Sequence, residues 1–352
     1  MVAYRSHRKP SQRGRSWPSR IAVLTAVAGA AAALSPAAPA GARPADPGAQ
    51  ADRAAVGSRI DRLYAQAEAA TEKYNAADER ARELQRQVEY AQESAARKQQ
   101  RVNRLRSALA SLAGAQYRSG GIDPSVALML TEDPDGYLDK AATLDRIGSR
   151  QQDDLQRFKS SQRSLKQERT EAGAKLTMLE RERADRARHK KAVLKKLKAA
   201  RELLRELSPA ERAERERASR SDGRGGSFEP GSGAQASSQR AASALAAARS
   251  AVGRPYVWGA AGPASFDCSG LTQWAYGKAG VSIPRTSQAQ RSAGRQVPMS
   301  QARPGDLVVY RDDASHVGMY AGDGQVVHAP HPGAPVRYDP VNMMPVSSVT
   351  RP

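Results

Sequence analysis

Three side chains near the carboxyl end of the sequence have the chemistry of a nucleophile, a base and a group that orients the base. Cys268 is the single cysteine among the 352 residues, and it lies in the run Phe-Asp-Cys-Ser-Gly. His316 and His328 follow it, in His-Val-Gly-Met-Tyr and Val-Val-His-Ala-Pro. A thiol with two downstream imidazoles predicts nucleophilic catalysis, with His316 as the base and His328 as its orienter.

Local sequence patterns place these groups on a helix and two strands. We expect a helix over 270–278, so Cys268 lies where backbone N–H groups are unpaired and favour a thiolate. We expect strands over 306–310, 316–320 and 325–329, with a tight Gly-Asp-Gly turn before the last. Alternation along paired strands then puts both imidazoles on one side, toward the helix that carries the thiol.

Each of these residues also has a structural interpretation. A single cysteine is often a buried small hydrophobe, and a histidine in a strand is often a satisfied structural residue. Zinc held by Cys268, His316 and His328 is a further alternative, but the sequence has no short ligand pair such as Cys-x-x-Cys. We therefore expect no metal and no cofactor, and the conjunction of the three groups favours catalysis.

The amino-terminal residues have the pattern of a secretion signal. A basic lead precedes an apolar run over 21–34, which is 14 residues long. A permanent span takes about 20 apolar residues, so we expect a signal peptide over 1–42 and a secreted, cell-wall associated protein. An uncleaved, anchored form is the alternative.

Heptad periodicity dominates the first half of the mature chain. Residues 57–113 repeat apolar or alanine residues at two positions per heptad, and a second charged helix follows over 145–207. An elbow over 117–124 separates them, so 57–207 is predicted to be an antiparallel coiled-coil hairpin, with parallel dimerisation as the alternative. We expect short linkers over 43–56 and a flexible one over 208–239. The remaining residues, 240–352, are predicted to form a small α+β domain.

The net charge is strongly positive. The chain carries a formal +20, with 56 basic and 36 acidic residues. Six of the basic residues lie in the lead, so the mature chain carries 50 − 36 = +14. Export and an aromatic content of 5% argue against nucleic acid as the partner, and an anionic cell envelope is the expected one. A basic surface that only aids solubility is the alternative.

Six sequence blocks in the last 113 residues resemble the NlpC/p60 cysteine peptidases. The blocks are Pro255-Tyr-Val-Trp-Gly259, Phe266-Asp-Cys-Ser-Gly-Leu271, Ile283-Pro-Arg-Thr-Ser287, Arg303-Pro-Gly-Asp-Leu307, His316-Val-Gly-Met-Tyr320 and Val327-His-Ala-Pro330. The resemblance implies a papain-like fold and hydrolysis of peptidoglycan stem peptides. The bond implied is the one between γ-D-glutamate and the following diamino acid.

The resemblance also implies roles for individual residues. By position, Cys268 is the nucleophile, His316 the base and His328 the third, polar member. Tyr256 matches a tyrosine that lines the site, and Asp267 with Ser269 matches residues that flank the thiol and help orient substrate. The Trp-Gly-Gly common in the family is Trp-Gly-Ala here, at 258–260. Backbone N–H groups around the thiol are the expected oxyanion donors.

The helical region over 50–207 resembles the coiled coils of exported actinobacterial and firmicute cell-wall hydrolases. This implies docking on a membrane-bound division or regulatory complex, and restraint of the catalytic domain by the hairpin. The sequence thus predicts a secreted D,L-endopeptidase for wall remodelling or daughter-cell separation. Alternatives are an amidase or acyl-transfer enzyme using the same triad, and a coiled-coil scaffold with a vestigial domain.

Overall fold

A computed structural model describes residues 47–118, 126, 129, 136–221 and 235–352. The predicted signal peptide over 1–42 lies outside these residues, as does most of the predicted elbow over 117–124. Residues Pro47–Pro352 form one compact unit, which includes both the helical region and the C-terminal domain. Among the helices described, none combines the length and the apolar content that a membrane crossing needs.

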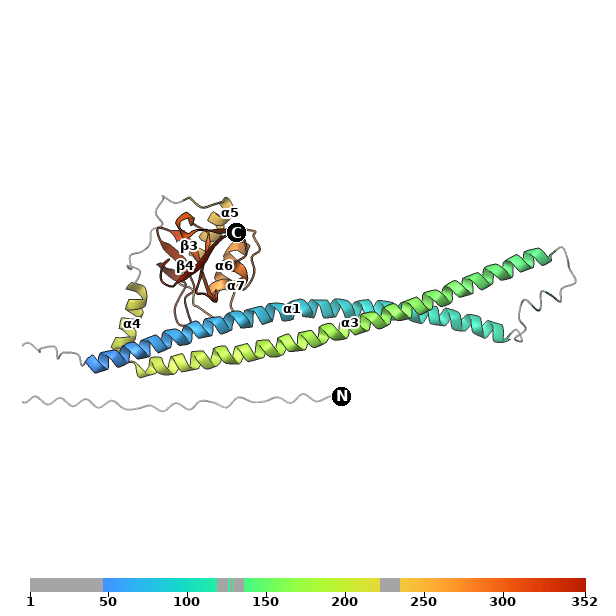
Figure 1. The fold of residues 1–352 in the computed structure, drawn as a ribbon, viewed down its shortest axis with the longest axis horizontal. Coiled ribbons are helices and arrows are strands. Elements are labelled where there is room, and N and C mark those ends of the chain that lie inside the picture. Colours follow the sequence, from blue (N-terminus) through green and yellow to red (C-terminus); the bar gives the residue numbers. More distant parts are fainter. Residues whose placement is uncertain (1–46, 119–125, 127–128, 130–135, 222–234) are drawn as a thin grey trace, which may run out of the picture. The chain divides into compact units, whose positions relative to one another are not determined.

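Two long helices form the amino-terminal part (Figure 1). Helix α1 spans Pro47–Arg118 and helix α3 spans Tyr137–Glu206. Both are rich in alanine, glutamate, arginine and glutamine, which are strong helix formers. Helix α1 begins before the predicted start at 57, so the linker predicted over 43–56 is wrong from Pro47 onward. The region over 47–56 is Ala-rich and has no interior helix breaker other than Gly48, so the helix continues through it.

Pairs of side chains show that α1 and α3 run antiparallel. Lys98 meets Glu168 at 2.5 Å, and Arg80 meets Glu182 at 3.0 Å. Lower numbers on α1 therefore face higher numbers on α3. The predicted heptad positions make the seam, with buried residues Ile60, Ala67, Ala70, Ala77, Ala81, Val88, Ala91 and Val102 on α1 and Leu165, Leu179, Val193 and Leu197 on α3. The antiparallel hairpin is confirmed.

The linker predicted over 208–239 needs one correction. Its first part is a helix, α4, over Pro209–Ser221. Ser208 and Glu211 close a reciprocal capping box, since Ser208 N–H donates to Glu211 at 2.7 Å and Glu211 N–H donates to the Ser208 hydroxyl at 3.2 Å. Capping outweighs the lack of an apolar period, which was the reason for predicting a flexible segment.

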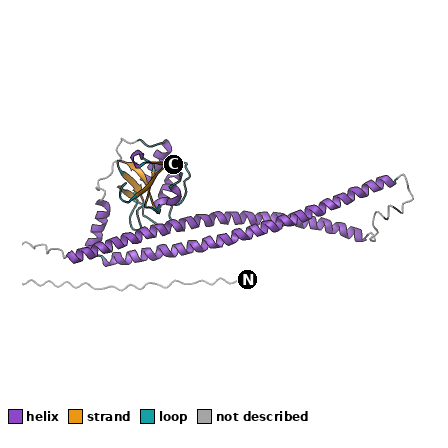
Figure 2. Cartoon of the chain, viewed as in Figure 1, coloured by secondary structure: helices purple, strands orange, loops and turns teal. Residues whose placement is uncertain are grey.

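The C-terminal domain is an α+β fold with one six-stranded antiparallel sheet (Figure 2). The strand order is β1-β6-β2-β3-β4-β5. The strands are β1 Arg295–Val297, β2 Leu307–Tyr310, β3 His316–Gly322, β4 Gln325–His328, β5 Arg337–Pro340 and β6 Val346–Arg351. The predicted strands correspond to β2, β3 and β4. The other three were missed because two are short and half-exposed and β6 is rich in serine and threonine.

Helices cover one face of this sheet. Helix α5 spans Gln239–Ser250, α6 spans Cys268–Lys278 and α7 spans Ser287–Gln290; a short 3-10 turn spans Met299–Gln301. The larger core cluster joins α5 and α6 to the sheet, and includes Leu245, Leu271, Tyr276, Leu307, Val309, Val317, Met319 and Val327. The core fixes the start of α6 against the sheet, which positions the thiol.

Candidate active site

Cys268 is the first residue of α6. Asp267 caps the helix, since its carboxylate accepts from the Gly270 N–H at 2.7 Å. Only glycine fits at position 270, because a Cβ there would lie 2.1 Å from the carbonyl oxygen of Ala260. The turn before the thiol is thus held against the loop over 255–261 by the cap and by this close approach.

The two predicted imidazoles meet. His316 lies at the start of β3 and His328 at the end of β4, and His316 Nε2 lies 2.8 Å from His328 Nδ1. Gly318 makes the approach possible, because a Cβ there would lie 3.2 Å from the His328 Cβ. Both rings are fully buried. The prediction that strand pairing brings the two histidines together is confirmed.

One part of that prediction is wrong. The histidines do not point toward the face that packs on α6, because they alternate with Val317 and Val327, which do. The thiol instead lies near the start of β3, where the backbone of Val317 favours the thiolate and lowers the pKa of Cys268 slightly. Cys268 therefore lies beside the backbone of the residue that follows His316.

Three further residues were predicted to line the site. Tyr256 is buried, and its hydroxyl lies near Cys268 and Asp267. Burial and the nearby acidic groups raise the pKa of Tyr256 well above its usual value. Asp267 and Ser269 are buried on either side of the thiol, and Arg285 binds both, at 2.6 Å to the Asp267 carboxylate and 2.9 Å to the Ser269 hydroxyl. The structure brings all six predicted site residues into one region.

Helix α1 supplies a carboxylate to this region. Glu72 Oε1 accepts from the Ser269 hydroxyl at 2.7 Å and lies 3.7 Å from the Cys268 sulfur. Its other oxygen, Oε2, accepts from the backbone N–H of Ser287 at 2.8 Å. Glu72 is only 1% exposed. An acidic side chain from the hairpin thus occupies the space next to the thiol.

Neighbouring turns of α1 complete this contact. Glu68 pairs with Arg311 at 2.5 Å, and its other oxygen lies 3.6 Å from His316 Nδ1, which is longer than a hydrogen bond. Asn75 donates to Asp267 at 3.1 Å. We name Glu68, Glu72 and Asn75 the α1 cover. They lie at spacings of four and three residues, which places them on one face of the helix.

Aromatic contacts flank the α1 cover on both sides. Tyr64 stacks on His331 with ring centroids 4.5 Å apart, and Tyr74 meets Trp258 edge to face at 5.2 Å. Together these contacts span about three turns of α1. His331 is half-buried and takes part in this stacking.

The electrostatics of the covered site oppose ionisation of the thiol. Burial, then the charges of Glu72, Asp267 and Glu68, raise the pKa of Cys268 well above its usual value. The expectation that the helix start favours a thiolate is therefore wrong for this state. Three carboxyl groups surround the sulfur, and the backbone N–H of Val317 only partly offsets them.

The acidic side chains of the α1 cover are themselves perturbed. Burial, followed by the negative charge of Asp267, raises the pKa of Glu72 to about 7. Burial would also raise the pKa of Glu68, but His316 and Arg311 more than offset it and lower that pKa below its usual value. One carboxyl group is thus destabilised as an anion in the docked state, and the other is stabilised.

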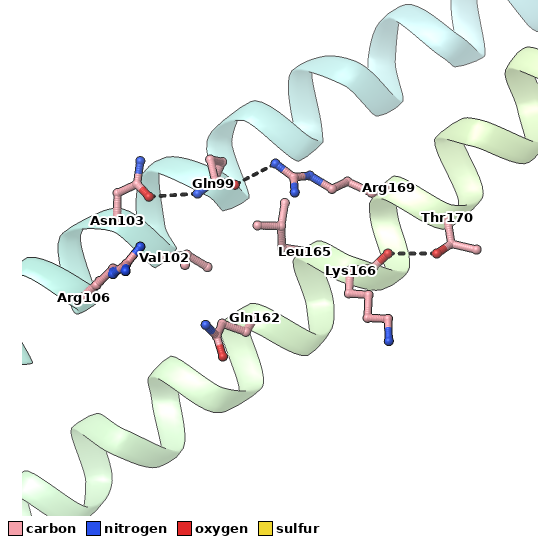
Figure 3. A pocket seen from close by; sticks show the side chains of 9 residues that line it. All are labelled: Gln99, Val102, Asn103, Arg106, Gln162, Leu165, Lys166, Arg169 and Thr170. Carbon is pink, nitrogen blue, oxygen red and sulfur yellow. Dashed lines mark hydrogen bonds between the residues drawn. The ribbon is translucent and has the colours of Figure 1, made fainter.

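A groove elsewhere lacks the groups of the candidate active site. It lies between α1 and α3, has a volume of about 510 Å³, and is lined by Gln99, Val102, Asn103, Arg106, Gln162, Leu165, Lys166, Arg169 and Thr170 (Figure 3). Arg169 crosses it to bind Gln99 at 2.8 Å. The lining holds amides, cations and a hydroxyl but no thiol, imidazole or carboxyl group, so it does not offer the chemistry of Cys268 and the two histidines.

Sequence reasoning missed four residues of the site. Asp339 accepts a hydrogen bond from His328 at 2.8 Å. Its position could not be predicted, because the sequence did not predict strand β5, which carries it. Arg285 lies within the Ile-Pro-Arg-Thr-Ser block, which was a usable signal. Glu68 and Glu72 lie in a heptad region where acidic residues outside the seam usually face solvent, so no local pattern marks them.

A thiol at a helix start, beside a sheet that carries paired buried imidazoles, is the arrangement of a cysteine hydrolase domain. Residues 253–350 match the NlpC/P60 family. A probable endopeptidase of Corynebacterium glutamicum is 49% identical over 104 residues, which cover 30% of this chain and 50% of that protein. A probable endopeptidase of Mycobacterium tuberculosis is 47% identical over 95 residues, covering 27% of this chain and 25% of that protein.

A solved structure is also similar. The P60 domain of an antigen from Mycobacterium avium subspecies paratuberculosis is 37% identical, covers 32% of this chain and 94% of that chain, and gives a TM-score of 0.31. The chain spans half or less of the length of the curated relatives named above. Residues 253–350 of this chain are an NlpC/P60 domain, as the six sequence blocks predicted.

Proposed function

We propose that this protein is a secreted, cell-wall associated peptidoglycan endopeptidase that uses Cys268 as its nucleophile. The observation that carries the proposal is the buried ring contact between His316 and His328 beside a thiol at the start of α6, within an NlpC/P60 domain. The names of the similar proteins, which are probable endopeptidases, support the reaction class.

In the proposed mechanism, His316 removes the thiol proton and the thiolate attacks the carbonyl carbon of a stem-peptide amide. Backbone N–H groups near the thiol stabilise the oxyanion. The tetrahedral intermediate collapses, and the proton on His316 passes to the departing amine. Water, deprotonated by His316, then attacks the thioester and releases the acid and the free thiol. The proposed bond joins γ-D-glutamate to the diamino acid.

Digestion of purified peptidoglycan tests this assignment. We expect the protein to release fragments whose masses match cleavage after γ-D-glutamate with the addition of one water, and Cys268→Ala to release none. Fragments joined to an added amine would support acyl transfer, and separation of stem peptide from glycan would support an amidase. Equal release by the wild type and Cys268→Ala would leave the scaffold function.

We further propose that the α1 cover restrains this activity. Glu72 takes two hydrogen-bond donors of the site and contacts the thiol, and Glu68 stands beside the free nitrogen of His316. A substrate carbonyl needs the same space. Access to Cys268 therefore requires α1 to leave, and a membrane-bound division or regulatory complex that binds the hairpin is the proposed trigger.

A charge reversal separates restraint from simple loss of structure. We expect full-length Glu72→Lys to cleave peptidoglycan about tenfold faster than the wild type, because a lysine cannot accept the hydrogen bonds from Ser269 and Ser287 and brings a second cation next to Arg285. Glu79→Lys is the matched control, since Glu79 is an exposed residue of the same helix and the charge change is identical. Restraint by α1 is wrong if both variants and the wild type cleave at one rate.

A further inference from the structure

A buried carboxylate binds the ring nitrogen of His328 that does not face His316. Asp339 Oδ2 lies 2.8 Å from His328 Nε2, while His328 Nδ1 lies 2.8 Å from His316 Nε2. Asp339 is 6% exposed. The three side chains form one buried line that ends at the remaining nitrogen of His316.

Arg337 holds the carboxylate in place. Its Nε donates to both Asp339 oxygens, at 3.0 and 2.9 Å, and a terminal nitrogen lies 2.8 Å from Oδ2. Arg337 is also the direct cross-strand partner of His328. Burial would raise the pKa of Asp339, but the hydrogen bonds from His328 and Arg337 lower it below its usual value. Asp339 is therefore an anion, and it can only accept.

The tautomers of both rings follow from this. Burial lowers the pKa of His328 to about 4, so the ring is neutral and carries one proton at neutral pH. That proton lies on Nε2, facing the carboxylate, and Nδ1 is an acceptor. His316 Nε2 must then donate to it. When His316 carries a single proton, that proton is on Nε2 and Nδ1 is bare.

The bare nitrogen lies next to the α1 cover. Among the described residues His316 Nδ1 has no hydrogen-bond partner, although it is buried. It lies 3.6 Å from Glu68, one helical turn from the residue that touches the Cys268 sulfur. An unprotonated Nδ1 can accept the thiol proton, whereas a protonated one cannot.

We propose that Asp339 is a positioning residue, which fixes the tautomer of His328 and through it that of His316, so that Nδ1 of His316 is free to act as the base. Only the role of His316 Nδ1 as the base rests on the proposed function. The proton order itself is a property of the folded chain, and it can be measured without any substrate.

Removal of the carboxylate releases the order. An amide would not do so, because the oxygen that faces His328, Oδ2, also takes two of the Arg337 contacts, and the amide oxygen would keep that place. In Asp339→Ala no acceptor faces His328 Nε2. The proton of His328 is then no longer held on Nε2, and both tautomers of His328 and of His316 become populated.

Nitrogen NMR of histidine-labelled full-length protein tests the order directly. We expect His316 and His328 to be Nε2–H tautomers in the wild type and in Asp339→Glu, and mixtures of both tautomers in Asp339→Ala. Wild-type rings that carry the proton on Nδ1, or rings that stay fully Nε2–H in Asp339→Ala, would overturn the proposal.

Activity gives the second measurement, in full-length Glu72→Lys so that the site is open. We expect Asp339→Ala to lower kcat about tenfold at unchanged KM, because only part of the molecules then carries the productive tautomer. Asp339→Glu should restore most of that loss. Asp306→Ala is the matched control, since Asp306 is a buried aspartate paired with Arg351 at 2.7 Å and forms no hydrogen bond with either histidine.

The outcomes separate the two proposals. Equal kcat losses in Asp339→Ala and Asp306→Ala, with equal falls in thermal stability, would mean that Asp339 is structural only. If the open chain without further changes does not cleave peptidoglycan, the proposed function fails, and the NMR result alone still decides the proton order.

Discussion

At the scale of single residues, the buried carboxyl group of Glu72 opposes ionisation of Cys268. The two groups lie 3.7 Å apart, and burial, followed by the charge of Glu72, raises the pKa of the thiol. A thiol in this state is a poor nucleophile, since the thiolate is the reactive form. The covered site therefore opposes attack by the sulfur for an electrostatic reason as well as a steric one.

Neutralising Glu72 is expected to make the thiol more acidic. In Glu72→Gln the inflection of the alkylation rate of Cys268 against pH should move to lower pH, with about a tenfold faster reaction at pH 7, because one adjacent negative charge is removed. Iodoacetamide labelling followed by mass spectrometry measures it. Glu79→Gln should leave the profile in place, and an unmoved inflection in Glu72→Gln would contradict this electrostatic account.

Docking of α1 should depend on pH through Glu72. Its pKa is raised from 4.5 to about 7 in the docked state, so the docked state binds the additional proton. The contribution is full below pH 4.5 and is lost as pH rises through about 7. Asp267, Arg285 and Cys268 are the charged or titratable groups that face Glu72.

Thermal unfolding measures this dependence. We expect the Tm of the wild type to fall relative to Glu72→Gln between pH 5 and pH 7.5, by about 2–4 °C for each kcal/mol of docking energy lost. Glu68 acts in the opposite direction, because its pKa is lowered and its contribution is lost in acid. A constant difference in Tm across the range would mean that Glu72 does not titrate there.

The predicted reactive residues were recoverable because their types and near neighbours are distinctive. Cys268 is the single cysteine, and the histidines lie in strands whose alternation is visible. Asp339 and Glu72 were not recoverable in this way. Asp339 reaches His328 only through the pairing of β4 with β5, and Glu72 reaches Cys268 across 196 residues of chain.

At the scale of elements, the start of α6 is the part that tolerates least change. We expect Gly270→Ala to lower the free energy of unfolding by about 3 kcal/mol, because the new Cβ would overlap the Ala260 carbonyl oxygen. Chemical denaturation of the full chain measures it. The displaced loop also carries Tyr256, so turnover should fall with stability.

A second glycine of α6 provides the control. A Cβ at Gly277 meets nothing within 4 Å, and alanine is favoured over glycine in a helix by roughly 0.5–1 kcal/mol. Gly277→Ala should therefore stabilise the domain slightly. If both variants behave alike, the close approach at Gly270 does not limit the fold.

Element boundaries were predicted least well where local pattern and final structure disagree. The capping box at Ser208 and Glu211 starts a helix in a stretch without apolar period. Strand β6 lies between β1 and β2 despite its serine and threonine content, because its pairing partners on both sides supply the hydrogen bonds. Such long-range pairing leaves no periodic signal in the segment itself.

At the scale of the whole molecule, two faces of α1 make different contacts. Alanines such as Ala67 and Ala70 pack against α3, and Glu68 with Glu72 faces the NlpC/P60 domain. The heptad pattern predicted the first face. The second was not predictable, because polar residues outside a seam have the same pattern whether they meet solvent or another domain.

The positive charge of the chain is expected to retain it on an anionic envelope. Binding of the full-length protein to isolated cell walls should weaken steeply between about 50 and 300 mM salt, because the attraction is screened within roughly 10 Å at 0.1 M. Cosedimentation measures it, with walls stripped of anionic polymers as the control. Binding that is independent of salt would contradict an electrostatic association.

The burial of Cys268 has a consequence for the lifetime of the protein. A solitary thiol has no neighbouring cysteine to rescue it after peroxide has oxidised it, and oxidation beyond the sulfenic acid is irreversible. At 1% exposure and with a raised pKa, the covered sulfur is protected from this damage. The proposed departure of α1 would admit oxidant together with substrate, so each molecule, once opened, would have a limited working life.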